Sequence, residues 1–214
     1  MNAHSTGLEL ILNAAEGVLQ IAVTDNESLL CAQQWHRSER ATEILAPALR
    51  DICAGLEVRL ADFRRIACVR GPGSFTGIRI GVAAVKGLAF PKDLPCVGVS
   101  TLAAIAQNFQ GIPGPAVVCA VMDARCQQVY TARFTLNADG SLQRDSPDQA
   151  MTIEDLAAVL SCIKKPVFLV GDGANLCYTA LQERELDLRL APEHLRFQNA
   201  AGVAAEAFRL AEEG

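Results

Sequence analysis

The order of strand-like and helix-like segments occurs twice along this chain, and that repetition constrains the fold more than any other feature of the sequence. The first copy opens with three strand-like runs, Leu8–Leu12, Val18–Thr24 and Leu29–Trp35, whose separators are short enough for hairpins. Helix-period and buried-strand runs then alternate as far as about residue 107. After the turn region Gly111–Pro115 the pattern starts again with the buried run Ala116–Met122.

Two lobes of the order β-β-β-α-β-α predict an α/β protein with the actin-like, sugar-kinase-like duplicated two-lobe fold. We place the first lobe at residues 1–110 and the second at residues 111–214. A single doubly wound sheet is the competing architecture, because alternation of helices and strands also favours it. The sequence does not specify the strand order of either sheet.

Local signals predict where several elements begin and end. Ser38 is expected to cap a helix that is kinked or broken at Pro47. Thr152 is expected to cap a second helix, and Val167–Val170 reads as a buried strand. Two further helical stretches are expected to end near Glu213.

Composition excludes several classes of protein. Half of the 214 residues are hydrophobic, which indicates a packed globular protein, and the net charge of −5 disfavours dense phosphate binding by this chain alone. The first residues carry neither a basic segment nor an apolar run, and no apolar run approaches the length of a bilayer span, so we expect a cytoplasmic protein without a membrane contact. The eight cysteines include no C-x-x-C pair, and we expect buried thiols rather than disulfides.

The stretch from Arg70 to Ala89 carries most of the functional information. Its glycines follow the spacing G-x-G-x-x-x-G, which is one residue longer than the dinucleotide fingerprint. Ile78-Arg79 stands where a Walker loop requires Lys and then Ser or Thr. We therefore expect a tight turn that leads into a helix capped by Ser74 or Thr76, and not a phosphate-binding loop.

The helix predicted over Ile78–Phe90 presents an unusual set of small side chains. At 100° per residue one stripe consists of small or aliphatic residues, Gly77, Gly81, Ala84 and Leu88. A neighbouring apolar stripe suits packing on a sheet and contains Ile78, Val82, Val85 and Ala89, while Arg79, Ala83 and Lys86 lie opposite. The glycine stripe would let another helix approach closely, and the pattern alone fits a helix of the same chain as well as one of a partner. If the stripe faces outward, Gly81→Leu should block docking without destabilising the fold.

Three ordered motifs resemble the TsaB (YeaZ) family of bacterial proteins. They are Gly71-Pro-Gly-Ser-Phe-Thr-Gly-Ile-Arg-Ile-Gly with Lys86-Gly-Leu-Ala89, then Val97-Gly-Val-Ser-Thr-Leu102, then Met122-Asp-Ala-Arg125 with Gln128-Val-Tyr130. The resemblance is dense from Ile66 to Phe134 and reduces to general architecture elsewhere.

The resemblance implies a non-catalytic subunit that acts in making threonylcarbamoyladenosine in tRNA. It implies docking, through the first two helices, to the catalytic paralogue TsaD or to a second copy of the chain as a homodimer. It further implies a TsaE-like ATPase as a partner, tRNA bound only indirectly through the complex, and ATP used by partner proteins rather than by this chain. The residues that we assign to the interface are Gly77, Ile80, Gly81, Ala84 and Leu88.

Two positions depart from the family pattern. Asn13-Ala14 stands where members usually have Asp-Thr, and Arg40 stands where they commonly have His. In actin-like folds an acidic residue at the first of these positions handles the metal-bound phosphate, so its loss weakens a nucleotide site.

The alternative function is a nucleotide-binding enzyme of actin-like fold, a small-molecule kinase or an ATPase. Gly171-Asp172-Gly173 would then lie near the adenosine, and these three residues are the weak cofactor-site candidates. The histidines are far apart and form no H-x-x-x-H motif, which excludes a helix-borne zinc site of the peptidase type. Asp123 and Arg125 fit turn chemistry better than catalysis, so we assign no catalytic and no metal-ligating residue.

Overall fold

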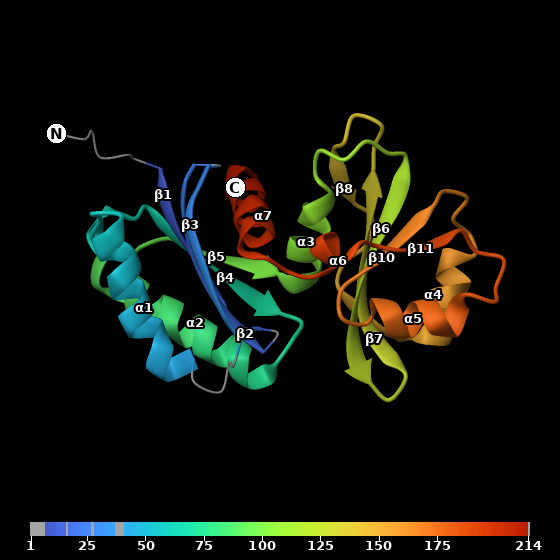
Figure 1. Ribbon diagram of the computed structural model, residues 1–214, viewed down its shortest axis with the longest axis horizontal. Helices are drawn as coiled ribbons and strands as arrows, with labels where there is room; N and C mark the ends of the chain where they lie inside the picture. Colours follow the sequence, from blue (N-terminus) through green and yellow to red (C-terminus); the bar gives the residue numbers. More distant parts are fainter. Residues whose placement is uncertain (1–6, 16, 27, 37–40, 214) are drawn as a thin grey trace. The chain divides into compact units, whose positions relative to one another are not determined.

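The computed structural model describes residues 7–15, 17–26, 28–36 and 41–213, which divide into two units (Figure 1). The first unit comprises residues 1–101 and 199–214, and the second comprises residues 102–198. The elements of the first unit are β1 (Leu8–Asn13), β2 (Val18–Asp25), β3 (Ser28–His36), α1 (Ala41–Gly55), η2 (Leu60–Asp62), β4 (Arg65–Gly71), α2 (Phe75–Ala89), η3 (Phe90–Lys92), β5 (Cys96–Ser100) and α7 (Ala200–Glu212).

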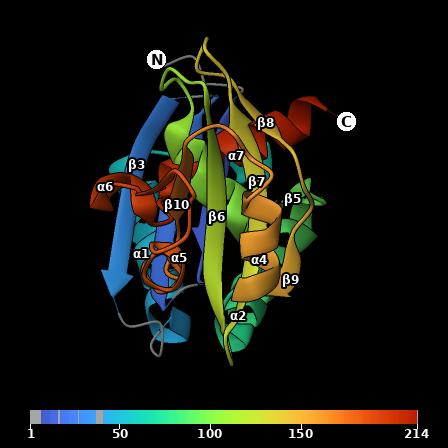
Figure 2. The ribbon, with the colours of Figure 1, turned by 90° about the vertical axis from the view of Figure 1, so that its right-hand side faces the viewer.

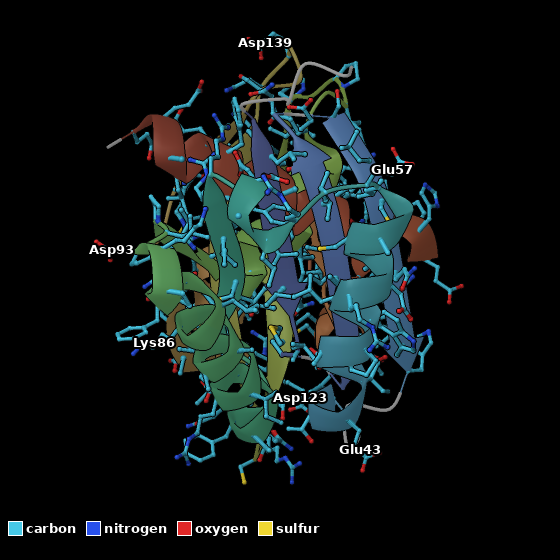
Figure 3. All side chains as sticks on the ribbon, turned by 90° about the vertical axis from the view of Figure 1, so that its left-hand side faces the viewer. Glu43, Glu57, Lys86, Asp93, Asp123 and Asp139 are labelled. Carbon is cyan, nitrogen blue, oxygen red and sulfur yellow. The ribbon has the colours of Figure 1, made fainter. Side chains whose placement is uncertain are left out.

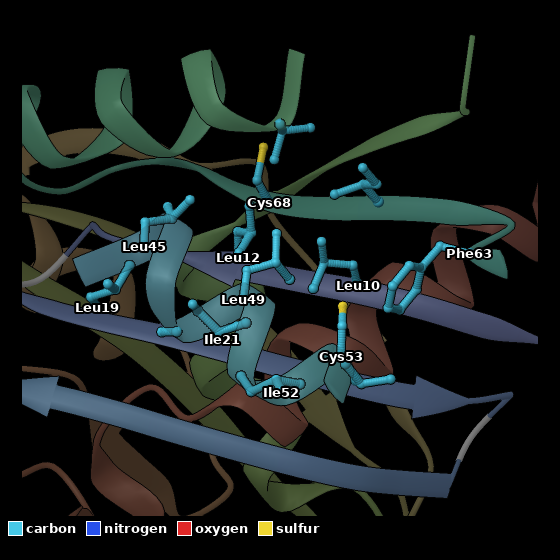
Figure 4. Close-up of a cluster of buried hydrophobic side chains, with 14 of the residues drawn as sticks. Leu10, Leu12, Leu19, Ile21, Leu45, Leu49, Ile52, Cys53, Phe63 and Cys68 are labelled. Atoms are coloured by element: carbon cyan, nitrogen blue, oxygen red, sulfur yellow. The ribbon is translucent and has the colours of Figure 1, made fainter. Parts of the chain in front are cut away.

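The first unit is a five-stranded sheet with helices on both faces, in the order β3-β2-β1-β4-β5. β1, β2 and β3 form an antiparallel meander, and β4 and β5 add to β1 in parallel. Every residue of β1 is buried, as expected for a central strand that is covered on both faces. α1 and α2 cover one face, where Leu10 and Leu12 pack against Leu45 and Leu49 of α1 (Figure 4). α7 covers the other face.

The second unit repeats this topology. Its elements are α3 (Thr101–Ala106), η4 (Gln107–Phe109), β6 (Ala116–Arg125), β7 (Gln128–Leu136), β8 (Leu142–Arg144), β9 (Gln149–Thr152), α4 (Ile153–Leu160), β10 (Val167–Val170), α5 (Ala174–Leu181), β11 (Leu188–Leu190) and α6 (Glu193–Arg196). The strand order β8-β7-β6-β10-β11 matches that of the first sheet, with β9 added beside β7. α4 and α5 lie together on one face (Figure 2), and α3 and α6 pack on the other.

The predicted repeat of three strands followed by alternating helices and strands is confirmed, and each unit extends it by one further strand. Val167–Val170 is a strand with the predicted bounds, and Thr152 caps α4 through a hydrogen bond from the backbone nitrogen of Asp155. The predicted break at Pro47 is wrong, because α1 continues across this residue. β9, β11 and α6 were not predicted. The predicted cap Ser38 lies outside the described residues.

The two units differ from the predicted lobes of 1–110 and 111–214. α3 and η4, within residues 101–109, belong to the core of the second unit, where Leu102, Ile105 and Phe109 are buried. α7 returns to the sheet of the first unit, with contacts to β1, β2, β4 and β5. Val203 and Ala207 of α7 are completely buried. A helix at the end of a chain carries no local signal of the sheet to which it returns, and this explains the difference.

Candidate partner-docking face on helices α1 and α2

Helix α2 begins at a glycine turn that follows β4 directly. Gly71 and Gly73 have φ values of +110° and +152°, a region that favours glycine over residues with side chains. Ser74 is the N-cap, and its hydroxyl accepts a hydrogen bond from the backbone nitrogen of Gly77 at 3.2 Å. The predicted turn and the predicted Ser74 cap are therefore confirmed.

The turn between β1 and β2 packs against the beginning of α2. A Cβ at Gly77 would lie 1.8 Å from the carbonyl oxygen of Ala14, and a Cβ at Gly73 would lie 2.6 Å from that of Ala15. The Ala15 oxygen also accepts a hydrogen bond from the backbone nitrogen of Ser74 at 2.6 Å. Two carbonyl oxygens thus occupy the positive end of the helix dipole, where a phosphate would otherwise bind.

The prediction that the glycine stripe faces outward is wrong. Gly77 and Gly81 are buried against their own chain, and the Cβ of Ala14 lies 4.0 Å from the position of a Cβ at Gly81. These glycines give β1 and its turn room to approach α2, which outweighs their cost of about 1 kcal/mol each in a helix. Gly81→Leu is consequently expected to destabilise the first unit instead of selectively blocking docking.

The remaining surface of α2 divides into rows of residues spaced four apart. The buried row is Gly77, Gly81, Val85 and Ala89. The row on the α1 side is Thr76, Ile80, Ala84 and Leu88, of which the last three are half-buried against the core. The exposed row is Phe75, Arg79, Ala83 and Gly87. The predicted exposure of Arg79, Ala83 and Lys86 is confirmed, and Figure 3 shows Lys86 on the side of α2 that faces away from α1.

An apolar groove runs between α1 and α2. Its volume is about 550 Å³, and it is lined by Thr42, Leu45, Ala46, Thr76, Arg79, Ile80, Ala83 and Ala84. The structure brings Ile80 and Ala84, both assigned to the interface from the sequence, into this groove. Leu88 packs against the core and does not line the groove. The α1 side of the groove was missed, although Thr42 and Ala46 repeat at the helical spacing of four.

The polar atoms of Asn13 are engaged in internal hydrogen bonds. Its side-chain oxygen accepts from the backbone nitrogen of Ala15 at 2.9 Å, and its amide nitrogen donates to Gln20 at 2.9 Å. Gln20 in turn donates to Gln34 at 2.7 Å. Asn13 is 1% exposed. Where the family pattern has an acidic residue, this chain therefore has a side chain that holds the β1–β2 turn in place. Arg40, the other departure from the family pattern, lies outside the described residues.

The turn Gly171-Asp172-Gly173 packs against the end of β6. A Cβ at Gly171 would lie 2.1 Å from the carbonyl oxygen of Val121, and one at Gly173 would lie 3.0 Å from the backbone nitrogen of Asp123. Asp172 accepts a hydrogen bond from that same nitrogen at 3.1 Å. Burial raises the pKa of Asp172, against the opposing effect of its backbone hydrogen bonds. Close backbone packing accounts for both glycines, and assigning these residues to a nucleotide remains a prediction.

The cysteines are all free, as predicted, but only half of them are buried. Cys96, Cys126 and Cys162 are exposed, and Cys31 is half-buried, because it lies on the outer strand β3. Burial raises the pKa of Cys177 to about 12, so this thiol is unreactive at neutral pH. Among the described residues, no three His, Cys, Asp or Glu side chains come together as a metal site. No helix in the described part of the chain is long and apolar enough to cross a bilayer.

Comparison with known proteins connects this fold to one family. The family model described as "TsaD: tRNA N6-adenosine threonylcarbamoyltransferase" matches residues 36–207. The "tRNA threonylcarbamoyladenosine biosynthesis protein TsaB" of Bacillus subtilis is 29% identical over 170 residues, which cover 78% of this chain and 72% of the relative. YeaZ from Pseudomonas aeruginosa superposes with a TM-score of 0.79 at 25% identity, covering 97% of this chain and 93% of that protein.

The chain belongs to the TsaB (YeaZ) family. This family acts in tRNA threonylcarbamoyladenosine biosynthesis. The predicted actin-like, sugar-kinase-like two-lobe fold is confirmed. A polyphosphate/ATP-glucomannokinase from Arthrobacter matches with a TM-score of 0.53 at 13% identity, covering 97% of this chain and 100% of that protein, a likeness of fold alone.

Proposed function

We propose that this TsaB-family chain is a non-catalytic subunit of the complex that installs threonylcarbamoyl on the adenosine beside the anticodon of tRNA. It docks to a TsaD-like catalytic paralogue through the face formed by α1 and α2. The observation that carries the proposal is the apolar groove between these helices, which is lined by Leu45, Ile80 and Ala84 and has small residues on its walls. Such a groove suits ridge-into-groove packing with a helix of another chain.

The surroundings of the first turn support a docking role over nucleotide chemistry. Asn13 is occupied by Ala15 and Gln20, and the carbonyl oxygens of Ala14 and Ala15 face the beginning of α2. A phosphate in this place would meet carbonyl oxygens and no carboxylate-held metal ion. In our proposal the TsaE-like ATPase and the tRNA are therefore partners of the assembled complex, ATP is used by the partner proteins, and the complex works in the cytoplasm.

Reconstitution of tRNA modification tests this proposal. With tRNA, ATP, threonine, bicarbonate and the adenylate-forming enzyme, this chain alone should give no product. Adding the paralogue and the ATPase should restore product formation. Ala46→Arg, which fills the α1 wall of the groove with a charged side chain, should lower the rate at subsaturating concentrations by about tenfold or more, because the complex is weakened by overpacking.

Ala54→Arg is the matched control for this experiment. Ala54 is also exposed on α1 but does not line the groove, so the variant should behave as the unchanged chain. Product formation by the isolated chain would contradict the non-catalytic role. Equal rates for the two arginine variants would contradict docking through the groove.

A further inference from the structure

Gly87 is a glycine that its own chain does not explain. It lies inside α2 and is exposed, and a Cβ built there would meet no atom within 4 Å. Gly77, by contrast, is explained by the Ala14 carbonyl oxygen. Glycine weakens a helix relative to alanine, so an open glycine in the middle of one lacks an internal reason. Ala83 lies one turn earlier in the same exposed row, and together the two residues leave the backbone of α2 accessible to another backbone.

Two phenylalanines flank this bare segment. Phe75 is 74% exposed at the beginning of α2, and Phe90 is 87% exposed just after its end. A helix rises about 1.5 Å per residue, so the two rings are anchored roughly 22 Å apart along it. Large aromatic side chains that are exposed in a free chain and lie beside small residues are typical anchors of a protein interface.

The segment is also cationic within an acidic protein. From Phe63 to Lys92 the sequence contains six Lys and Arg residues and no Asp or Glu, whereas the whole chain has a net charge of −5. Among the residues that the structure describes, Arg79 and Lys86 form no ion pair. The guanidinium of Arg79 stacks on the ring of Phe75 at 5.1 Å, which holds both side chains in place before a partner arrives.

We infer that an acidic helix of the catalytic paralogue crosses α2 at Ala83 and Gly87, with carboxylates against Arg79 and Lys86 and apolar contacts for the two exposed phenylalanines. This inference rests on the proposed function and adds the contact point and the charge of the partner. It also selects between two occupants. In a two-fold pair of identical chains that cross here, Arg79 and Lys86 would approach their own copies, and like charges at an interface disfavour that pairing.

Gly87→Leu tests the contact point. The substitution should raise the dissociation constant of the complex with the paralogue about ten- to a hundred-fold, because the new side chain holds the backbones apart. The melting temperature should not fall, since the site is open in the free chain. Gly55→Leu is the matched control: Gly55 is an open, exposed glycine at the end of α1, and its replacement should leave affinity unchanged.

The double variant Arg79→Glu/Lys86→Glu tests the charge. It should weaken the complex by about tenfold or more, and the remaining affinity should no longer fall as ionic strength rises. Unchanged paralogue affinity for Gly87→Leu would overturn the inference and leave the proposed function intact. Loss of a self-dimer by Gly87→Leu, with unchanged paralogue binding, would overturn it in favour of a second copy. Failure of the unaltered chain to bind the paralogue would overturn the proposed function itself.

Discussion

Gly77→Ala should destabilise the first unit by about 3 kcal/mol or more, although it adds only one methyl group. The reason is that the new Cβ would lie 1.8 Å from the carbonyl oxygen of Ala14, a backbone atom that cannot rotate away. Either the β1–β2 turn or the start of α2 must move, and the Ser74-to-Ala15 hydrogen bond at 2.6 Å would be disturbed by either movement. Urea unfolding followed by the fluorescence of Trp35 reports on this unit, because Trp35 is the only tryptophan and lies in β3.

Gly87→Ala is the control for that experiment. The same methyl group at this open position should stabilise the chain by up to about 1 kcal/mol, since alanine favours the helix over glycine. Equal urea midpoints for Gly77→Ala and the unchanged chain would show that Ala14 does not pack against α2 as described.

Glu9→Gln should destabilise the same unit by about 3–5 kcal/mol, the usual result of removing one partner from a buried ion pair. Glu9 is 1% exposed in the central strand β1, and its carboxylate accepts hydrogen bonds from both Arg64 and Arg65. The Arg65 side chain is only 14% exposed, so its charge would lose its carboxylate partner in a poorly hydrated place. The free energy of unfolding, again followed by Trp35, measures the effect.

Glu154→Gln provides the matched surface pair. Its ion pair with Arg184 at 2.6 Å involves a glutamate side chain that is 74% exposed, and such pairs contribute at most about 1 kcal/mol. A loss for Glu9→Gln as small as that for Glu154→Gln would contradict a structural role for the buried cluster.

The sequence allowed most long elements to be predicted, because their periodicity is local. β1, β2 and β7 showed apolar or alternating runs, and the caps Ser74 and Thr152 followed from side-chain chemistry. The short strands β9 and β11 each have four residues or fewer, too few for a period to be recognised. Their pairing with β7 and β10 stabilises them, and this is a tertiary effect.

The orientation of α2 illustrates what a single helix cannot reveal. Its sequence shows that Gly77 and Gly81 share a face, but not that the turn at Ala14, more than sixty residues earlier, covers that face. The same limit applies to the groove. Ile80 and Ala84 were predicted from α2, whereas the contribution of Ala46 depends on α1 lying beside α2. Gly87 was visible in the sequence, but only the structure shows that nothing in the chain fills the space beside it.

Hydrogen exchange of this chain, with and without its TsaD-like paralogue, tests the docking face most directly. Backbone amides of α1 (Ala41–Gly55) and of α2 with η3 (Phe75–Lys92) should exchange more slowly in the mixture, with the strongest change around Ala83 and Gly87. Exchange in the β6–β7 hairpin at Arg125–Gln128 and along the outer strand β3 should not change. Protection confined to β3 or to that hairpin, with α1 and α2 exchanging as in the free chain, would contradict docking through these two helices.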